Sequence, residues 1–111
     1  MYRLYEFTPS GNAYKVRLLL TQLKIPFERI EIDILKGESN TPEFLKMNSN
    51  GRIPVLEISK ACYLAESNAI LWYLADGTKF LPVDKLERAL VLKWLFFEQY
   101  SHEPNIATPR Y

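Results

Sequence analysis

Cysteine and histidine are nearly absent from this sequence, which contains a single residue of each, Cys62 and His102. One cysteine cannot form an internal disulfide, and such usage is typical of proteins from a reducing compartment. Without a Cys-x-x-Cys pair there is no dithiol redox centre, so a redox domain of the thioredoxin type is disfavoured. His102 has no cysteine and no second histidine beside it, and a metal site is therefore not expected.

Excess charge and long apolar segments are also missing. The formal net charge is +1, so the overall charge favours neither nucleic acid nor an anionic membrane as a partner. No stretch approaches the roughly 20 apolar residues of a membrane span, and the charged opening residues 1–6 lack the apolar run of a signal peptide. Hydrophobic residues make up 48% of the 111, enough for one modest core. We expect a soluble, cytoplasmic protein.

The first third of the chain predicts a strand, a helix and a second strand. Residues 2–7 are rich in aromatic and aliphatic side chains, which indicates a buried strand. Apolar residues then recur at helical spacing from Ala13, with Asn12 as the expected N-cap and Pro26 closing the helix. Residues 27–34 alternate apolar and polar, and a strand that follows a crossover helix should run parallel to the first. The basic residues of the helix are expected to form a solvated face: Lys15, Arg17 and Lys24.

The middle of the chain predicts a short helix, a hairpin and a longer helix. Thr41-Pro42 is typical of a helix start, and strands at 55–58 and 61–63 are close enough to form a hairpin. Cys62, inside the second of these strands, is expected to be buried. A further helix opens at residues 66–68 and ends near Gly77. The order β-α-β-α-β-β-α predicts an α/β fold, a small mixed sheet with helices on its faces.

The last quarter of the chain predicts a helix that belongs to a different unit. We expect a first domain at residues 1–78, a linker at 79–83 and a helical segment at 84–111, beginning with Asp84 as a cap. This helix is apolar on nearly every side and needs partners all round. The first domain could cover only one side of it. We infer either that the chain is part of a longer protein or that another subunit covers the helix.

Three short segments could carry chemistry. Ile53-Pro54 lies between a turn and a strand, where a cis bond would leave the main chain of Ile53 free to pair with a peptide-like ligand; a plain strand-initiating proline is the alternative. Ser67 could cap its helix, or could hold a ligand carboxylate with the free amides there, with Glu66 binding an ammonium group. Ser10-Gly11-Asn12 follows the first strand, where α/β sheets place ligands.

Ser10 is the most reactive candidate among them. The sequence offers it no nearby histidine, so a triad nucleophile is poorly supported. A hydroxyl at this point could instead donate to an anion such as a thiolate, and thereby lower the pKa of the thiol. An ordinary turn serine without a ligand is the alternative interpretation.

Taken together, these residues resemble the glutathione transferase superfamily, whose N-terminal domain has a thioredoxin-like βαβ-ββα fold with a four-stranded mixed sheet. The resemblance covers the whole chain, and the tail resembles the first helix of the family's all-helical C-terminal domain. One departure is Ser49, where the family commonly has proline, and it should be harmless in a turn. The matching stretches are residues 5–12 and 14–20, residues 48–56 (Asn-Ser-Asn-Gly-Arg-Ile-Pro-Val-Leu) and residues 64–74 (Leu-Ala-Glu-Ser-Asn-Ala-Ile-Leu-Trp-Tyr-Leu).

The resemblance implies a role for each site residue. Ser10 is similar to the hydroxyl that stabilises the glutathione thiolate in serine-type members, and Asn12 to an asparagine that assists the sulfur in some bacterial members. Ile53, before the family's cis-proline at Pro54, would pair with the cysteinyl part of glutathione. The remaining implied contacts are Glu66 and Ser67 with the γ-glutamyl end and Arg52 with the glycine carboxylate.

Two functions from different classes follow from the resemblance. The first is an enzyme of detoxification, a homodimer that transfers the glutathione thiolate to a small electrophile without a metal. Isomerase, disulfide-reductase and dehalogenase activities are related possibilities within the same fold. The second is a catalytically idle module for dimerisation or complex assembly. Such modules can lose the glutathione-holding residues, and their presence here favours the enzyme.

Overall fold

The computed structural model describes residues 1–99, which fall into two compact units, one of residues 1–74 and a second that begins at Ala75. The predicted order of elements and the four-stranded mixed sheet are confirmed. The strands are β1 (Tyr2–Glu6), β2 (Phe27–Glu31), β3 (Val55–Ser59) and β4 (Cys62–Ala65), in the sheet order β2-β1-β3-β4. The helices of this part are α1 (Gly11–Gln22), α2 (Pro42–Met47) and α3 (Ser67–Ala75). β1 and β2 are parallel, and the other two pairings are antiparallel.

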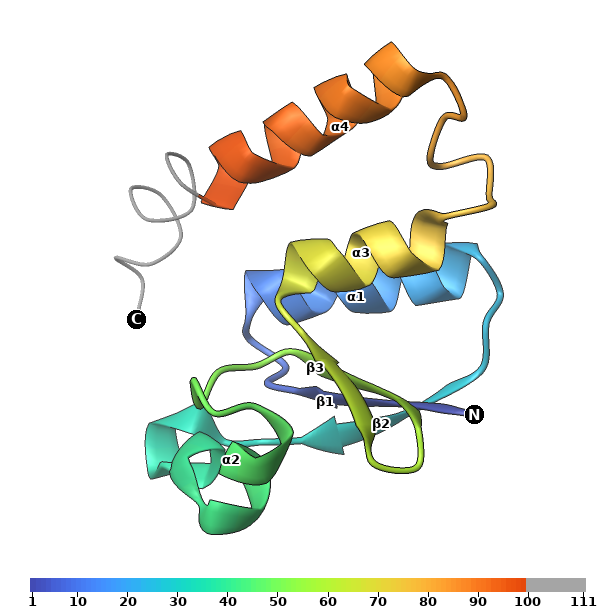
Figure 1. The fold of residues 1–111 in the computed structure, drawn as a ribbon. Helices are drawn as coiled ribbons and strands as arrows, with labels where there is room; N and C mark the ends of the chain where they lie inside the picture. Colours follow the sequence, from blue (N-terminus) through green and yellow to red (C-terminus); the bar gives the residue numbers. More distant parts are fainter. Residues whose placement is uncertain (100–111) are drawn as a thin grey trace. The chain divides into compact units, whose positions relative to one another are not determined.

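The sheet has helices on both faces. In Figure 1, α1 and α3 lie side by side over one face, and α2 lies on the other side. Leu4 and Leu56 are register partners with no exposed surface. Because side chains alternate along a strand, they face α1 and α3, whereas the neighbouring pair Tyr5 and Val55 packs against Phe44 of α2. Consecutive apolar residues of β1 and β3 therefore supply a core layer on each face of the sheet.

Two local predictions were wrong. β2 ends at Glu31 rather than continuing to Ile34, because the Asp33 side chain accepts a hydrogen bond from the Leu35 N–H at 3.0 Å and caps a 3₁₀ turn, η1 (Ile34–Lys36). A second 3₁₀ turn, η2 (Glu38–Asn40), follows. Cys62 is exposed rather than buried, since β4 is the edge strand of the sheet and has a neighbour on one side only.

The second unit contains α4 (Lys85–Phe97). Asp84 caps it as expected, accepting from the Glu87 N–H at 3.0 Å. Large apolar side chains along it are exposed, which agrees with the predicted all-round apolar surface: Leu86, Leu90, Trp94, Phe96 and Phe97. No helix within residues 1–99 has the length and apolarity needed to cross a membrane. The prediction made for His102 lies outside the described residues.

The turn before β3 requires glycine at position 51. Gly51 has φ +64°, and a Cβ there would lie 2.8 Å from Asn40 Oδ1 and 3.1 Å from the Ser39 carbonyl. We expect Gly51→Ala to lower the free energy of unfolding by about 1–3 kcal/mol, measured by urea denaturation. Gly11→Ala is the matched control, because nothing lies within 4 Å of its Cβ position. Equal stabilities of the two variants would contradict this account of the turn.

Candidate functional site

The strand register brings the three candidate segments to one end of the sheet, where β1 and β4 end and β3 begins. Tyr5 of β1 pairs with Val55 of β3, and Val55 pairs with Ala65 of β4. The end of β1, the start of β3 and the end of β4 therefore lie next to one another, and the segments that adjoin them are Ser10-Gly11-Asn12, Ile53-Pro54 and Glu66-Ser67. Figure 1 shows that α1 and α3 also begin at this end and run in the same direction. The positive ends of two helix dipoles thus face the same region.

Ser10, and not Asn12, is the N-cap of α1. Its Oγ accepts from the Ala13 N–H at 3.2 Å, and its own N–H donates to the Phe7 carbonyl at 2.8 Å. Asn12 instead lies half-buried in the first turn of the helix. Serine and asparagine are equally good caps, so the turn closed by Phe7 decides between them. Since the Ser10 oxygen accepts the capping bond, the hydroxyl hydrogen remains available for a ligand.

The peptide bond between Ile53 and Pro54 is cis. The Ile53 side chain packs against the Tyr5–Phe44–Val55 cluster, and within residues 1–99 no group forms a hydrogen bond with its main chain. The turn before it is held by Asn48, whose Nδ2 donates to the Arg52 carbonyl at 2.9 Å. The Arg52 side chain itself is exposed.

Glu66 and Ser67 form the corner between β4 and α3. Glu66 has φ +72°, and its carbonyl accepts from the Ile70 N–H at 3.0 Å, so the helix begins at once. The Glu66 side chain is exposed, and Ser67 is only 5% exposed. Between residues 1 and 99 neither side chain has a hydrogen-bond or ion-pair partner. The corner therefore presents a carboxylate and a hydroxyl whose bonding capacity is unused.

Two basic residues of α1 were wrongly expected to be solvated. Lys15 Nζ donates to Asn68 Oδ1 at 2.9 Å and joins α1 to α3 close to the site. The Arg17 side chain is 18% exposed and forms an ion pair at 2.9 Å with Glu6, which has no exposed surface. The sequence held a signal for this pairing in Glu6, because a carboxylate in a strand that is expected to be buried needs a cationic partner.

Thr8, in the turn after β1, also has partners that sequence reasoning missed. Its hydroxyl and its N–H donate to the Glu31 carboxylate at 2.7 and 2.9 Å. These two bonds, the hydroxyl bond first, hold the pKa of Glu31 below its ordinary value.

Among residues 1–99, no three His, Cys, Asp or Glu side chains gather in a way that could hold a metal ion.

The sequence comparison decides the family. Residues 1–76 match the family model described as glutathione S-transferase, N-terminal domain. The chain belongs to the glutathione S-transferase family. The glutathione S-transferase N-terminal fold is thioredoxin-like, and the four-stranded sheet described above has that architecture. The sequence resemblance and the predicted fold class are thereby confirmed.

Known members of the glutathione S-transferase family are similar over nearly all of the chain. The crystal structure of glutathione S-transferase from Pseudomonas fluorescens is 52% identical, with a TM-score of 0.96, over 98% of this chain and 54% of that one. Protein URE2 of Debaryomyces hansenii is 34% identical over 95% of this chain and 37% of its own length. The disulfide-bond oxidoreductase YfcG of Escherichia coli is 37% identical over 83% and 46%. The chain thus spans about half or less of these relatives.

Proposed function

We propose that the protein binds glutathione at this end of the sheet and activates its thiol for transfer to a small electrophile. The observation that carries the proposal is the hydrogen bonding of the Ser10 hydroxyl. Its oxygen accepts the capping bond from the Ala13 N–H at 3.2 Å, which leaves its hydroxyl hydrogen free to donate to a ligand. The first amides of α1 add positive potential there. Membership of the glutathione S-transferase family supplies the ligand class.

The other site residues would hold the rest of the tripeptide. The unpaired main chain of Ile53 would form strand-like hydrogen bonds with the cysteinyl residue. At the α3 corner, Ser67 and the first helix amides would bind the γ-glutamyl carboxylate, and the exposed Glu66 would bind its ammonium group. Arg52 would reach the glycine carboxylate, and Asn12 would assist at the sulfur.

The proposed reaction needs no group beyond glutathione and the electrophile. The thiol loses its proton to solvent, and the Ser10 hydroxyl donates a hydrogen bond to the resulting thiolate. The sulfur lone pair then forms a C–S bond with the electrophilic carbon, whose leaving group departs with the displaced electron pair or whose π bond accepts it. One charge-assisted hydrogen bond of about 1.5–3 kcal/mol would lower the thiol pKa by about one to two units.

The same proposal extends to the organisation of the whole protein. We place the glutathione-binding domain at residues 1–78 and the linker at 79–83, with 84–111 as the start of the helical domain that builds the second-substrate pocket. We further propose a cytoplasmic homodimer that acts in detoxification. Support comes from the family and from the exposed apolar surface of α4, which a helical domain would bury.

A second candidate is glutathione-dependent disulfide reduction, which the similarity to the oxidoreductase YfcG favours. Here the activated glutathione thiolate would attack a substrate disulfide, and one substrate thiol would leave. A second glutathione would attack the mixed disulfide, releasing the other thiol and oxidised glutathione. The site would be the same, because Ser10 would again stabilise the attacking sulfur. Assays with a chlorinated aromatic electrophile and with a small disulfide separate the two reactions.

The proposal is tested first by titration calorimetry of glutathione with the complete protein. Ser67→Ala removes a hydrogen bond to a charged group worth about 1.5–3 kcal/mol and should weaken binding by about 10-fold to 100-fold. Ser59→Ala, an exposed serine at the other end of β3, should leave affinity unchanged. Absence of glutathione binding by the wild type would favour the idle dimerisation or assembly module instead.

A further inference from the structure

Glu6 is a fully buried carboxylate for which the proposed chemistry has no use. It is the last residue of β1, one position before Phe7, whose carbonyl accepts the Ser10 N–H. Its two oxygens face two different arginines: Oε1 forms an ion pair with Arg17 Nε of α1 at 2.9 Å without the geometry of a hydrogen bond, and Oε2 accepts a hydrogen bond from Arg29 Nε of β2. Glu6 therefore connects β1 to α1 on one face of the sheet and to the neighbouring edge strand β2.

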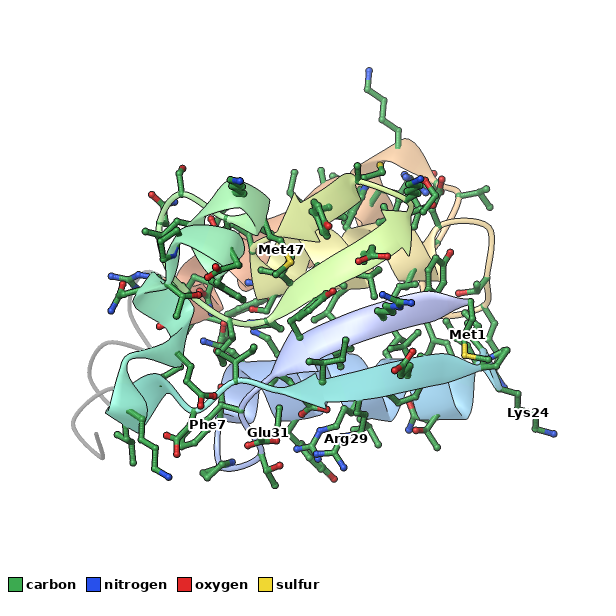
Figure 2. The ribbon with its side chains drawn as sticks, turned by 90° about the horizontal axis from the view of Figure 1, so that it is seen from below. Met1, Phe7, Lys24, Arg29, Glu31 and Met47 are labelled. Atoms are coloured by element: carbon green, nitrogen blue, oxygen red, sulfur yellow. The ribbon has the colours of Figure 1, made fainter. Side chains whose placement is uncertain are left out.

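Each arginine also reaches Thr8 with its terminal nitrogen. Arg17 Nη2 donates to the Thr8 carbonyl at 3.3 Å, and Arg29 Nη2 donates to Thr8 Oγ1 at 2.9 Å. Thr8 in turn donates twice to Glu31. Figure 2 shows Arg29 and Glu31 on β2, with Glu31 the nearer of the two to Phe7 in this view. Thr8, although exposed, is thus held by groups from α1 and from β2.

Thr8 lies two positions before Ser10 in a tight turn. The Ser10 N–H donates to Phe7 at 2.8 Å, and the Tyr14 N–H donates to the Ser10 carbonyl at 3.0 Å. With both the start and the end of the turn fixed, few movements of Ser10 remain. A hydroxyl must be placed within a few tenths of an ångström to donate well to a thiolate.

We propose that Glu6, Arg17 and Arg29 are positioning residues for Ser10: the forked arginines connect the buried carboxylate to Thr8 and thereby aim the Ser10 hydroxyl at the sulfur. This inference rests on the proposed function for its ligand. It also explains why a carboxylate occupies a fully buried strand position. A buried ion pair seldom adds stability over well-packed apolar residues, whereas the planar guanidinium can bond two partners in fixed directions.

The test uses Arg17→Lys and Arg29→Lys, which keep the positive charge beside Glu6 but cannot contact Glu6 and Thr8 through two separate nitrogens. We expect kcat at neutral pH to fall by about 10-fold to 100-fold, with a raised apparent pKa of the bound thiol. Glutathione affinity should change little, because the proposed function gives neither arginine a contact with the ligand. Arg3→Lys is the matched control, since Arg3 pairs with Glu28 at 3.5 Å at the start of β1, far from the turn.

A ligand-free measurement separates this inference from the proposed function. Hydrogen exchange of the Ser10 and Ala13 amides, which the turn and the cap protect, should accelerate in both lysine variants. The Phe44 amide, capped by Thr41 at 3.2 Å, should exchange at the wild-type rate. If the wild type binds no glutathione, the proposed function fails, and the exchange result alone decides whether the network holds the turn. Normal exchange, or wild-type thiol pKa and kcat in both lysine variants, would overturn the inference.

Discussion

Replacing Ser10 by alanine is expected to raise the apparent pKa of bound glutathione thiol by about one to two units while leaving glutathione affinity nearly unchanged. The hydroxyl hydrogen would bond the thiolate and no other part of the ligand, so its loss disfavours ionisation and not the tripeptide contacts at Ile53 and Ser67. At a pH below the thiol pKa, the thiolate fraction and the transfer rate should both fall by about 10-fold to 100-fold. Ultraviolet absorbance of the thiolate, followed across a pH titration, measures the shift.

Controls must separate this effect from the loss of a helix cap. Ser10→Ala also removes the acceptor for the Ala13 N–H and should cost about 0.5–2 kcal/mol of stability. Thr41→Ala removes an equivalent cap at 3.2 Å from α2 and should destabilise similarly without moving the thiol pKa. Ser10→Gly keeps most of the capping energy yet should shift the thiol pKa as much as alanine does. An unchanged thiol pKa in both Ser10 variants would refute the assigned role.

Phe44→Ala is expected to cause the largest loss of stability of any variant considered. Phe44 is 1% exposed and packs against Tyr5 and Val55, with Ile53 in contact with the same cluster. Truncation would leave a cavity between α2 and the sheet and lower the free energy of unfolding by about 3–5 kcal/mol. Urea or thermal denaturation measures the loss. Because Ile53 loses its support, glutathione affinity should also fall at temperatures where the variant stays folded.

Leu35→Ala is the control for the core prediction. Leu35 lies in η1 and is 75% exposed, so its truncation removes little buried surface. We expect a change within about 0.5 kcal/mol. A Phe44→Ala variant as stable as Leu35→Ala would mean that α2 does not contribute to the core as described.

The order of elements and the fold class could be predicted because they depend on patterns that are local in sequence. The apolar composition of residues 2–7, helical spacing after Ala13 and the Thr41-Pro42 start each depend on neighbours within a few positions. The exact ends could not be predicted, since several residues there compete for the same role. Ser10 and Asn12 are both good caps, and only the turn closed by Phe7 decided for Ser10.

In the candidate site, too, local signals could be read from the sequence and long-range contacts could not. Ser10, Ile53-Pro54 and Glu66-Ser67 could be identified from the chain because each is a recognisable local signal, a turn, a proline before a strand or a helix start. Arg17 was taken for a solvated residue, because its partner Glu6 lies 11 positions earlier (17 minus 6) on another element. The exposure of Cys62 likewise depended on its strand being at the edge of the sheet.

The sequence by itself determined the secondary elements, the family and the residue types available to a ligand. Only the tertiary structure decided that Ser10, Ile53 and Ser67 lie at one end of the sheet, that Ile53-Pro54 is cis, and that Glu6 is connected through two arginines to the turn that carries Ser10. The physical reason is the range of the interactions involved. Hydrophobic periodicity and capping act between neighbours in the chain, whereas strand register and buried ion pairs join residues that approach one another only when the sheet forms.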